Sequence, residues 1–246
     1  MTVAPPADGE VHVWHARWAA ADEPALRAWA LPVVSAAEHA RAERRATAPL
    51  RLRQLAASAM TRTVLARYLD AEPAALAFEA GAHGKPGLAR PAWRWLRYNL
   101  SHSGDAIALA VAVGREVGVD VECVVALPDA ERLAERFFTA GERAIVLAHS
   151  VGHARQRVFY RLWTLKEAYL KGVGTGITVP LATAEVELGK TGARLARGTG
   201  ATRQDDPPPW SLSELALAPD VVGAVAVAGP ISGVVLHAFQ PGLAPD

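Results

Sequence analysis

Two consecutive apolar segments constrain the fold of this chain more than any other feature of its sequence. Ala106–Val113 and Val117–Cys123 have the length and the residue types of buried β-strands, and only Gly114-Arg115-Glu116 separates them. Two such segments joined by a short link that contains glycine are typical of a β-hairpin. The sequence therefore predicts two strands here, joined by a tight turn.

Helix signals lie on both sides of this pair. Ser35-Ala-Ala-Glu38 and Thr139-Ala-Gly-Glu142 are capping-box patterns, in which the two side chains satisfy free backbone donors and start a helix. Apolar spacing predicts long helices at Pro49–Leu69 and Ala154–Lys171, the second with Gly172 as its C-cap. Further elements are expected as a helix at Pro128–Phe138, strands at Val11–Ala19, Arg97–Ser101, Val179–Leu188, Arg194–Gly198 and Val221–Val227, and a loop at Asp205–Pro209. Helices beside antiparallel strands in each half favour an α+β fold.

The composition excludes several classes of protein. The chain has 246 residues, of which 51% are hydrophobic and 21% charged, and its formal net charge is +1. This composition is globular, and the balanced charge argues against a surface built wholly for nucleic acid. The single cysteine, Cys123, cannot form an intrachain disulfide, and the longest uncharged apolar runs cover half a membrane span. Because the N-terminus also lacks a signal-peptide pattern, the sequence favours a cytoplasmic protein.

Two acidic residues share one face of the second apolar strand. Asp120 and Glu122 alternate with valines, so both carboxylates point to one side and Val119 and Val121 to the other. Carboxylates held this close form a hard oxygen site of the kind that binds Mg²⁺ together with substrate phosphates. The alternative is a half-exposed strand that shows acidic residues to water.

A stripe of functional residue types lies near the end of the long C-terminal helix. Trp163, Glu167 and Lys171 are spaced by four residues and therefore lie on one face. This stripe fits the rim of a site. It also fits an ordinary Glu–Lys helix pair, worth about 0.3 to 0.5 kcal/mol and without function.

Two further groups of residues suit phosphate binding. Ser101 and His102 precede Ser103-Gly104 at a strand end, where a hydroxyl and an imidazole can bind phosphate oxygens and His102 can move a proton. A plain polar turn explains them equally well. Five arginines cluster around the start of the helix Pro49–Leu69 and fit a solvated helix face, a nucleic-acid patch or a site for a small anion: Arg41, Arg44, Arg45, Arg51 and Arg53.

The order of the motifs along the chain carries more information than any one of them. They are Gly84-Lys-Pro86, Asn99-Leu-Ser-His-Ser103, Val117-Gly-Val-Asp-Val-Glu122, Arg136-Phe-Phe-Thr-Ala-Gly-Glu142 and the segment Trp163–Gly176. This series, which spans about residues 35 to 180, resembles the 4'-phosphopantetheinyl transferases of the larger, surfactin-synthetase-activating type. The resemblance implies transfer of the phosphopantetheine arm of coenzyme A to a serine of an acyl or peptidyl carrier protein, with Mg²⁺ and with release of 3',5'-ADP.

The resemblance also implies a fold and an assignment of residues. The expected α+β fold has two similar halves in a pseudo-twofold, fused-dimer-like arrangement, residues 1–112 and 113–246, with the active site in the cleft between them. The implied metal ligands are Asp120, Glu122 and Glu167. The implied coenzyme A contacts are Arg41, Arg53, Lys85, Ser101, His102 and Lys171. Catalytic roles fall to Glu167, Lys171 and His102, and Glu167 takes the serine proton, directly or through a metal-bound water.

Lysine is rare, and its positions are informative. Of the 26 lysines and arginines, four are lysines, and three of these lie inside the motifs: Lys85, Lys166 and Lys171. A compact ammonium is not interchangeable with a planar guanidinium beside a crowded phosphate and metal. The motif lysines are therefore expected to have individual roles.

Two other classes of function use the same features. A Mg²⁺-dependent hydrolase of nucleotide or coenzyme A pyrophosphate needs the same carboxylates, and a non-catalytic binder of coenzyme A or nucleic acid needs only the arginines. If the chain is a transferase, we expect coenzyme A and an apo carrier protein as its partners, and neither nucleic acid nor a membrane. Since a chain of two fused halves makes its own cleft, a monomer is expected.

Overall fold

The computed structural model of the chain describes residues 2–18, 22–81, 84–175, 179–190, 192–198 and 209–241. Three expected features fall partly outside these residues. Ala19 at the end of the first expected strand, Gly176 at the end of the last motif, and all of the expected loop Asp205–Pro209 except Pro209 lie outside the described residues.

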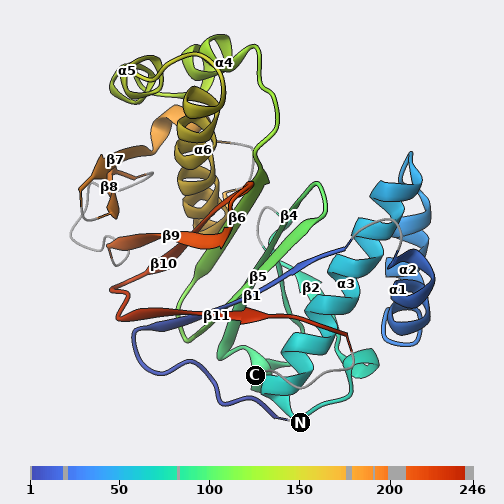
Figure 1. The fold of residues 1–246 in the computed structure, drawn as a ribbon. Coiled ribbons are helices and arrows are strands. Elements are labelled where there is room, and N and C mark those ends of the chain that lie inside the picture. Colours follow the sequence, from blue (N-terminus) through green and yellow to red (C-terminus); the bar gives the residue numbers. More distant parts are fainter. Residues whose placement is uncertain are drawn as a thin grey trace.

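A four-stranded sheet contains both the first and the last strand of the chain (Figure 1). Its strands are β1 (Glu10–Arg17), β4 (Leu96–Ser103), β5 (Ala106–Val113) and β11 (Gly233–Ala238), in the spatial order β11-β1-β5-β4. Strand β5 pairs antiparallel with β1 and β4, whereas β11 pairs parallel with β1. The last described strand therefore completes a sheet that the first described strand starts.

A three-stranded antiparallel sheet carries the acidic strand. Its strands are β6 (Val117–Cys123), β9 (Trp210–Ala218) and β10 (Val221–Ala228), in the order β6-β10-β9. Two small antiparallel pairs complete the described strands: β2 (Phe78–Ala80) with β3 (Pro86–Leu88), and β7 (Glu185–Gly189) with β8 (Gly192–Arg197).

Six α-helices lie in the described part of the chain. They are α1 (Glu23–Ala30), α2 (Ala36–Glu43), α3 (Ala48–Leu69), α4 (Ala130–Phe137), α5 (Ala140–Leu147) and α6 (His153–Val173), with single 3-10 turns at Pro73–Ala75, Pro91–Trp93 and Leu181–Thr183. Both predicted capping boxes are confirmed, because Ser35 and Thr139 each accept from the backbone N–H three residues on and receive the reciprocal contact from Glu38 and Glu142. No helix among the described residues has the length and apolarity that a membrane span requires.

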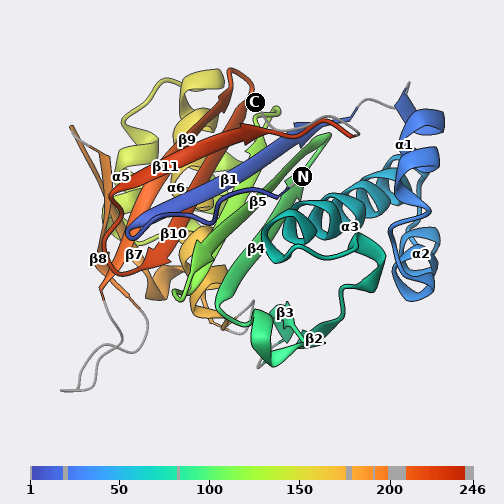
Figure 2. The ribbon, with the colours of Figure 1, turned by 90° about the horizontal axis from the view of Figure 1, so that it is seen from below.

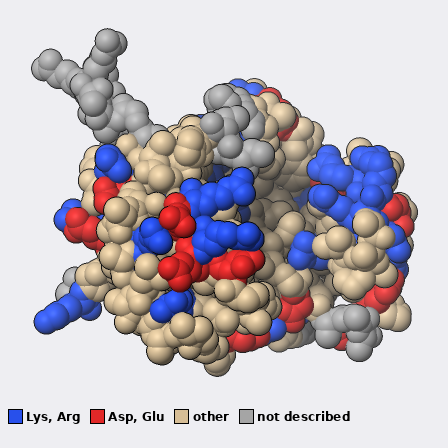
Figure 3. All heavy atoms as spheres, turned by 90° about the horizontal axis from the view of Figure 1, so that it is seen from above, with Lys and Arg blue, Asp and Glu red and all other residues tan. Residues whose placement is uncertain are grey.

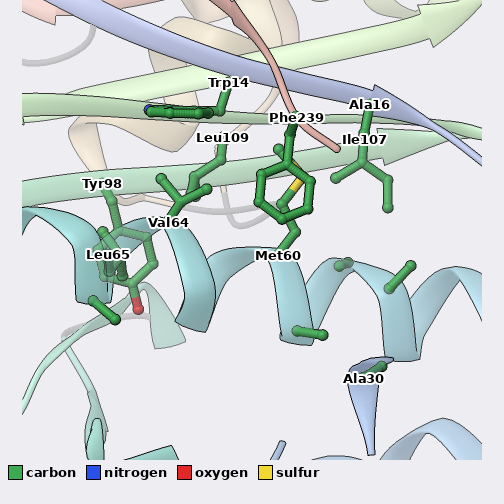
Figure 4. Close-up of a cluster of buried hydrophobic side chains, with 14 of the residues drawn as sticks. Trp14, Ala16, Ala30, Met60, Val64, Leu65, Tyr98, Ile107, Leu109 and Phe239 are labelled. Atoms are coloured by element: carbon green, nitrogen blue, oxygen red, sulfur yellow. The ribbon is translucent and has the colours of Figure 1, made fainter. Parts of the chain in front are cut away.

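The two sheets pack face to face, and one long helix covers the outer face of each (Figures 1 and 2). Met60 and Val64 of α3 pack against Trp14, Ile107 and Leu109 of the four-stranded sheet (Figure 4). The outer core of the three-stranded sheet joins α6 to β10 through Leu165, Ala168, Ala224 and Ala226. Between the sheets lie small side chains of β1, β5, β6 and β10, including Val13, Ala110, Val119 and Val225. This α+β arrangement agrees with the predicted fold class.

The predicted hairpin between the two apolar strands is wrong. Strand β5 pairs with β1 and β4, and β6 pairs with β10, so Gly114-Arg115-Glu116 leads the chain from one sheet to the other. The tight hairpin lies one turn earlier, between β4 and β5, where Gly104 has a φ of 56°. Apolar periodicity identifies both strands but does not determine which strands they pair with.

The predicted end of the long helix is also wrong by two residues. Helix α6 continues through Gly172 to Val173, and Gly174, with a φ of 81°, is its left-handed C-cap. Gly172 and Gly118 are glycines for another reason: α6 crosses β6 in direct backbone contact. A Cβ on Gly118 would lie 2.0 Å from the carbonyl oxygen of Ala168, and one on Gly172 would lie 2.4 Å from the ring of Trp210.

A buried cluster of polar aromatic side chains joins β1, β11 and α3. The Trp14 indole donates to Tyr68 Oη at 2.8 Å, and His12 Nδ1 lies 2.7 Å from the same oxygen. The ring of His237 stacks on Trp14 with centroids 4.4 Å apart, and its Nε2 is buried without a hydrogen-bond partner among the described residues. Burial lowers the pKa of His12, although Glu10 opposes this; burial and then His12 lower the pKa of His237.

We expect Gly118→Ala to destabilise the fold strongly, because its Cβ would meet backbone atoms of α6 that cannot move independently. Overpacking of this kind costs about 1 to 3 kcal/mol or more, measurable as a lower free energy of unfolding in urea. Gly172→Ala should cost less, because its clash is with the Trp210 side chain. Gly87→Ala is the control, since a Cβ at this residue would meet no atom within 4 Å. Equal stability of all three variants would contradict direct helix–strand contact.

The histidine cluster predicts a loss of stability at acidic pH. Because the folded state holds His12 and His237 with lowered pKa values, the unfolded chain binds more protons below about pH 6.5, and the free energy of unfolding falls as the pH drops through that value. Urea unfolding between pH 8 and pH 5.5 measures this slope. His237→Phe should reduce the slope and the exposed His153→Gln should not; an unchanged slope in His237→Phe would argue against the cluster.

Candidate active site

Strands β4 and β6 and helix α6 bring three polar side chains into contact. Asp120 of β6 is 3% exposed, and its Oδ1 accepts from Ser101 Oγ of β4 at 2.8 Å and from Lys171 Nζ of α6 at 2.5 Å. Lys171 Nζ also lies 3.0 Å from Ser101 Oγ. Asp120 lies on the face of β6 opposite the valines, as the alternation predicts, and Gly118 on that same face contacts α6. The contact among Ser101, Asp120 and Lys171 therefore links both sheets to α6.

Two further carboxylates stand near this contact. Ser103 Oγ of β4 donates to Glu122 Oε2 at 2.5 Å, one strand repeat along from Ser101 and Asp120. Burial raises the pKa of Glu167 on α6, and the charges of Asp120 and Glu122 raise it further. Burial raises the pKa of Glu122 and of Asp120 as well, and Lys171 opposes both shifts. The three carboxylates therefore repel one another in a partly dry site.

The donor chemistry of this site fits a divalent cation. Asp120 Oδ2 is buried and has no hydrogen-bond partner among the described residues, so one hard oxygen is free for a ligand. A cation would also relieve the repulsion among the carboxylates. As the side chains now stand, no group of three His, Cys, Asp or Glu residues in the described ranges converges on a single ion position. The ammonium of Lys171 is the positive charge beside Asp120.

His102 and Arg53 meet at the turn between β4 and β5. Arg53 of α3 donates from Nη1 to the carbonyl oxygen of Gly104 at 3.3 Å, and burial followed by the charge of Arg53 lowers the pKa of His102. Arg41, in contrast, is exposed on α2, and no hydrogen bond or ion pair within the described residues joins it to His102 or Arg53. Of the two predicted arginine contacts, the structure brings only Arg53 to this turn.

Lys85 is part of a junction at the other end of β6. Its ammonium donates to Glu116 Oε2 and to the carbonyl oxygen of Gly172 at 2.7 Å each, and to that of Val117 at 3.1 Å. Burial lowers the pKa of Lys85 and Glu116 opposes that shift. Because these three acceptors use its three protons, Lys85 clamps the loop before β3 to β6 and to the end of α6. Its predicted contact with a phosphate remains a prediction.

Sequence reasoning singled out Ser101 for phosphate binding but did not predict that side chains of β4 join this strand to β6. Asn99 Oδ1 accepts from the backbone N–H of Val119 at 2.9 Å, and the hydroxyls of Ser101 and Ser103 accept from those of Val121 and Cys123 at 3.3 Å each. Their spacing of two along β4 was the available signal, because such residues share one face of a strand. These acceptors take the place of a backbone ladder along this edge of β6.

A buried ion pair supports the helix face that carries Glu167. Lys166 is 0% exposed and Glu142 1% exposed, and Lys166 Nζ contacts Glu142 Oε1 at 2.7 Å, Oε2 at 2.5 Å and the carbonyl oxygen of Ala184 at 2.6 Å. Glu142 also accepts from the backbone N–H groups of Thr139 and Val186 at 2.8 Å each. One pair thus ties α5, α6 and β7 together, next to the residue that faces the site.

Comparison with known proteins identifies the family of this chain. Two family models match, one described as the 4'-phosphopantetheinyl transferase superfamily over residues 116–226, the other as 4'-phosphopantetheinyl transferase, N-terminal, over residues 16–114. The 4'-phosphopantetheinyl transferase HetI of Nostoc sp. is 37% identical over 222 residues, which cover 89% of this chain and 88% of HetI. The chain belongs to the 4'-phosphopantetheinyl transferase superfamily. The resemblance stated from the motifs is therefore confirmed.

Other transferases show the same similarity over shorter lengths. The phosphopantetheinyl transferase of Thraustochytrium sp. is 33% identical over 191 residues, covering 67% of this chain and 66% of that protein. The transferase Sfp of Bacillus subtilis is 29% identical over 140 residues, 57% of this chain and 60% of Sfp. A holo-(acyl-carrier-protein) synthase of Bacillus anthracis, solved in complex with CoA (3',5'-ADP), is 24% identical with a TM-score of 0.39, covering 46% of this chain and 94% of that one.

The buried pair predicts a large, non-additive loss of stability. Lys166→Met leaves the Glu142 carboxylate buried without its cation, and we expect a loss of about 3 to 5 kcal/mol in the free energy of unfolding. The double variant Lys166→Met with Glu142→Leu should recover part of that loss, because no charge then remains buried. The exposed pair Arg194–Glu187 supplies the matched control, and Arg194→Met should change stability by less than about 1 kcal/mol. Additive losses in a double-mutant cycle would contradict the coupling.

Proposed function

We propose that this transferase moves the 4'-phosphopantetheine arm of coenzyme A to a serine hydroxyl of an apo acyl or peptidyl carrier protein, with Mg²⁺, and releases 3',5'-ADP. The observation that supports this most directly is the meeting of Ser101, Asp120 and Lys171, with Glu122 and Glu167 close by. Hydroxyl, ammonium and carboxylates in one partly buried place suit the transfer of a phosphoryl group, which depends mainly on positioning and electrostatics.

The proposal includes two α+β halves, residues 1–112 and 113–246, in a pseudo-twofold arrangement with the site between them. In its support, each half contributes one long helix, α3 or α6, on the outer face of one sheet. The proposed site takes Ser101 and His102 from the first half and its carboxylates and Lys171 from the second. Strand β11 departs from a simple division, because it returns to pair with β1.

Each residue has a proposed task in the transfer. Asp120, Glu122 and Glu167 would hold Mg²⁺, which supplies neutralisation of charge on the pyrophosphate. Ser101, His102 and Lys171 bind the phosphates of coenzyme A, and the ammonium of Lys171 stabilises the charge that develops on the departing 3',5'-ADP. Lys85, Arg41 and Arg53 are proposed as further contacts to coenzyme A.

The proposed reaction is an in-line displacement at phosphorus. The serine oxygen of the carrier bonds to the phosphorus on the pantetheine side, and the bond from that phosphorus to the bridging oxygen breaks. The electron pair leaves with 3',5'-ADP, and the serine proton passes to Glu167. Burial and the charges of the neighbouring Asp120 and Glu122 raise the pKa of Glu167, and Lys171 opposes that shift. The proposal also keeps the expected cytoplasmic location and monomeric state.

Incubation of the protein with coenzyme A, Mg²⁺ and an apo carrier protein tests this function. Mass spectrometry should show the carrier gaining one phosphopantetheine group, and chelation of the metal should abolish the gain until Mg²⁺ is restored. An unmodified carrier across fatty-acid, polyketide and peptide types would contradict the proposal. Consumption of coenzyme A without carrier modification would indicate a hydrolase, and binding without turnover would indicate a non-catalytic module.

The same assay tests the base. Glu167→Gln removes the proton acceptor and one metal ligand, and we expect kcat to fall by about 10²-fold or more at saturating Mg²⁺. The control is Glu187→Gln, whose side chain is exposed on β7 and which should keep wild-type kcat. Near-normal transfer by Glu167→Gln would show that another group takes the proton.

A further inference from the structure

Arg17, the last residue of β1, joins two acidic turns. Its Nε and Nη2 donate to the carboxylate of Asp105 at 3.0 and 2.9 Å, and its Nη1 donates to Asp220 Oδ1 at 2.8 Å. Asp105 lies in the turn between β4 and β5, and Asp220 lies in the turn between β9 and β10. Because these two turns belong to different sheets, one guanidinium connects the four-stranded sheet to the three-stranded one.

The main chain ties each of these turns to a neighbouring strand. The carbonyl oxygen of Asp105 accepts from the backbone N–H of Trp18, directly after β1, at 3.2 Å. That of Asp220 accepts from the backbone N–H of Val124, directly after β6, at 2.8 Å. The hydrogen bonds to Asp105 and then to Asp220 raise the pKa of Arg17, and Arg17 lowers the pKa of Asp220. Both carboxylates are therefore held on anchored backbone where Arg17 can bind them.

An arginine from each long helix binds one of the same two turns. Arg53 Nη1 of α3 donates to the carbonyl oxygen of Gly104 at 3.3 Å, and Arg157 Nη1 of α6 donates to that of Pro219 at 2.8 Å. These two carbonyl groups directly precede the two aspartates in sequence. Arg17 is therefore the central link in a series of contacts that runs from α3, through both turns, to α6.

The charge of Arg17 is used within the fold. Each nitrogen of its guanidinium donates to a carboxylate, and two carboxylates outweigh its single positive charge. In this it differs from the basic side chains gathered over α2 and the start of α3, which lie beside a hollow in the surface (Figure 3). A planar guanidinium that binds a carboxylate with two parallel hydrogen bonds also fixes its orientation. Arg17 is therefore suited to set the relative position of the two turns.

The two turns lie on either side of the strand end that carries Glu122. Ser103 directly precedes the turn between β4 and β5, and its hydroxyl donates to Glu122 Oε2 at 2.5 Å and accepts from the backbone N–H of Cys123 at 3.3 Å. Cys123 Sγ lies 3.1 Å from the carbonyl oxygen of Ser103. Val124, the next residue, donates to the turn between β9 and β10. The position of the Glu122 carboxylate therefore depends on how the two turns are seated against the end of β6.

We propose that Arg17 is a positioning residue for the metal site. By joining the two turns it seats Ser103 against the end of β6, so that the Ser103 hydroxyl holds Glu122 in place for a divalent cation. This inference rests on the proposed function, in which Glu122 is a metal ligand. Hydrogen-bonded partners orient the ligands of a metal, and loss of such a partner weakens metal binding. Loss of Arg17 therefore weakens metal binding without removing any group that touches the metal.

Titration of the protein with Mn²⁺ in saturating coenzyme A, followed by electron paramagnetic resonance, tests the inference, because Mn²⁺ takes the same oxygen ligands as Mg²⁺. Arg17→Met should raise the dissociation constant for Mn²⁺ by about threefold or more, and Ser103→Ala, which removes the direct contact, by about tenfold or more. In the carrier assay Arg17→Met should raise the Mg²⁺ concentration that gives half the maximal rate, and keep wild-type kcat at saturating Mg²⁺.

A double variant separates positioning from a general loss of stability. Because Arg17 acts through Ser103, adding Arg17→Met to Ser103→Ala should cause no further loss of Mn²⁺ affinity. Asp105→Asn should weaken Mn²⁺ binding as Arg17→Met does, since it removes the negative charge and one of the two oxygen acceptors. Wild-type Mn²⁺ affinity in Asp105→Asn would contradict the role of this turn.

Arg27→Met is the matched control, since Arg27 also binds two carboxylates, those of Glu23 and Glu43 on α1 and α2, and it should keep wild-type Mn²⁺ affinity. The side chain of Arg17 is 42% exposed, so its variant should keep a melting temperature close to that of the wild type. Wild-type Mn²⁺ affinity in Arg17→Met, or a further loss on the Ser103→Ala background, would overturn the role of Arg17. Failure of the wild-type protein to bind Mn²⁺, or to modify any carrier, would instead overturn the proposed function and the inference with it.

Discussion

The contact between β4 and β6 is the constraint on which the rest of this structure depends. Along this edge, the side chains of Asn99, Ser101 and Ser103 accept from backbone N–H groups that a neighbouring strand would otherwise bind. A hydroxyl can accept and donate at once, so Ser101 and Ser103 also donate to Asp120 and Glu122. The same side chains therefore hold the sheets together and orient the carboxylates of the proposed site. A regular β-ladder between β4 and β6 would satisfy the same backbone N–H groups of β6, but it would provide no hydroxyl donors for Asp120 and Glu122.

Close approach of α6 to β6 completes this arrangement. With glycine at 118 and 172, the helix lies directly on the strand, and Lys171 can reach Asp120 from the helix to form a short ion pair. Lys85 fixes the same crossing from outside through the carbonyl oxygens of Val117 and Gly172. Backbone proximity, rather than side-chain length alone, thus sets the distance between the ammonium and the carboxylate.

Local sequence rules predicted the faces of strands and the starts of helices. The features that they did not predict depend on contacts between residues distant in sequence. Alternation placed Asp120 on the face of its strand opposite the valines, and both capping boxes formed, because each depends on a few neighbouring residues. The predicted hairpin was wrong because the strand that pairs with β6 is β10, which is distant in sequence. Gly172 was assigned to a cap because a glycine that ends a helix and one that admits a neighbouring strand look alike in sequence. The rarity of lysine indicated individual roles for Lys85 and Lys166, but it did not identify the acceptors that these lysines contact.

The pairing of β11 with β1 determines when the four-stranded sheet can close during synthesis of the chain. The residues of β11, Gly233–Ala238, pair with β1, which is made long before β11, and Trp14 of β1 stacks on His237 of β11. One edge of β1 therefore stays open until β11 has been made, and open strand edges are prone to pair with other chains. The N-terminal sheet cannot be finished as an independent unit ahead of the rest. Closure of the first sheet therefore waits for β11, which follows every other strand of both sheets.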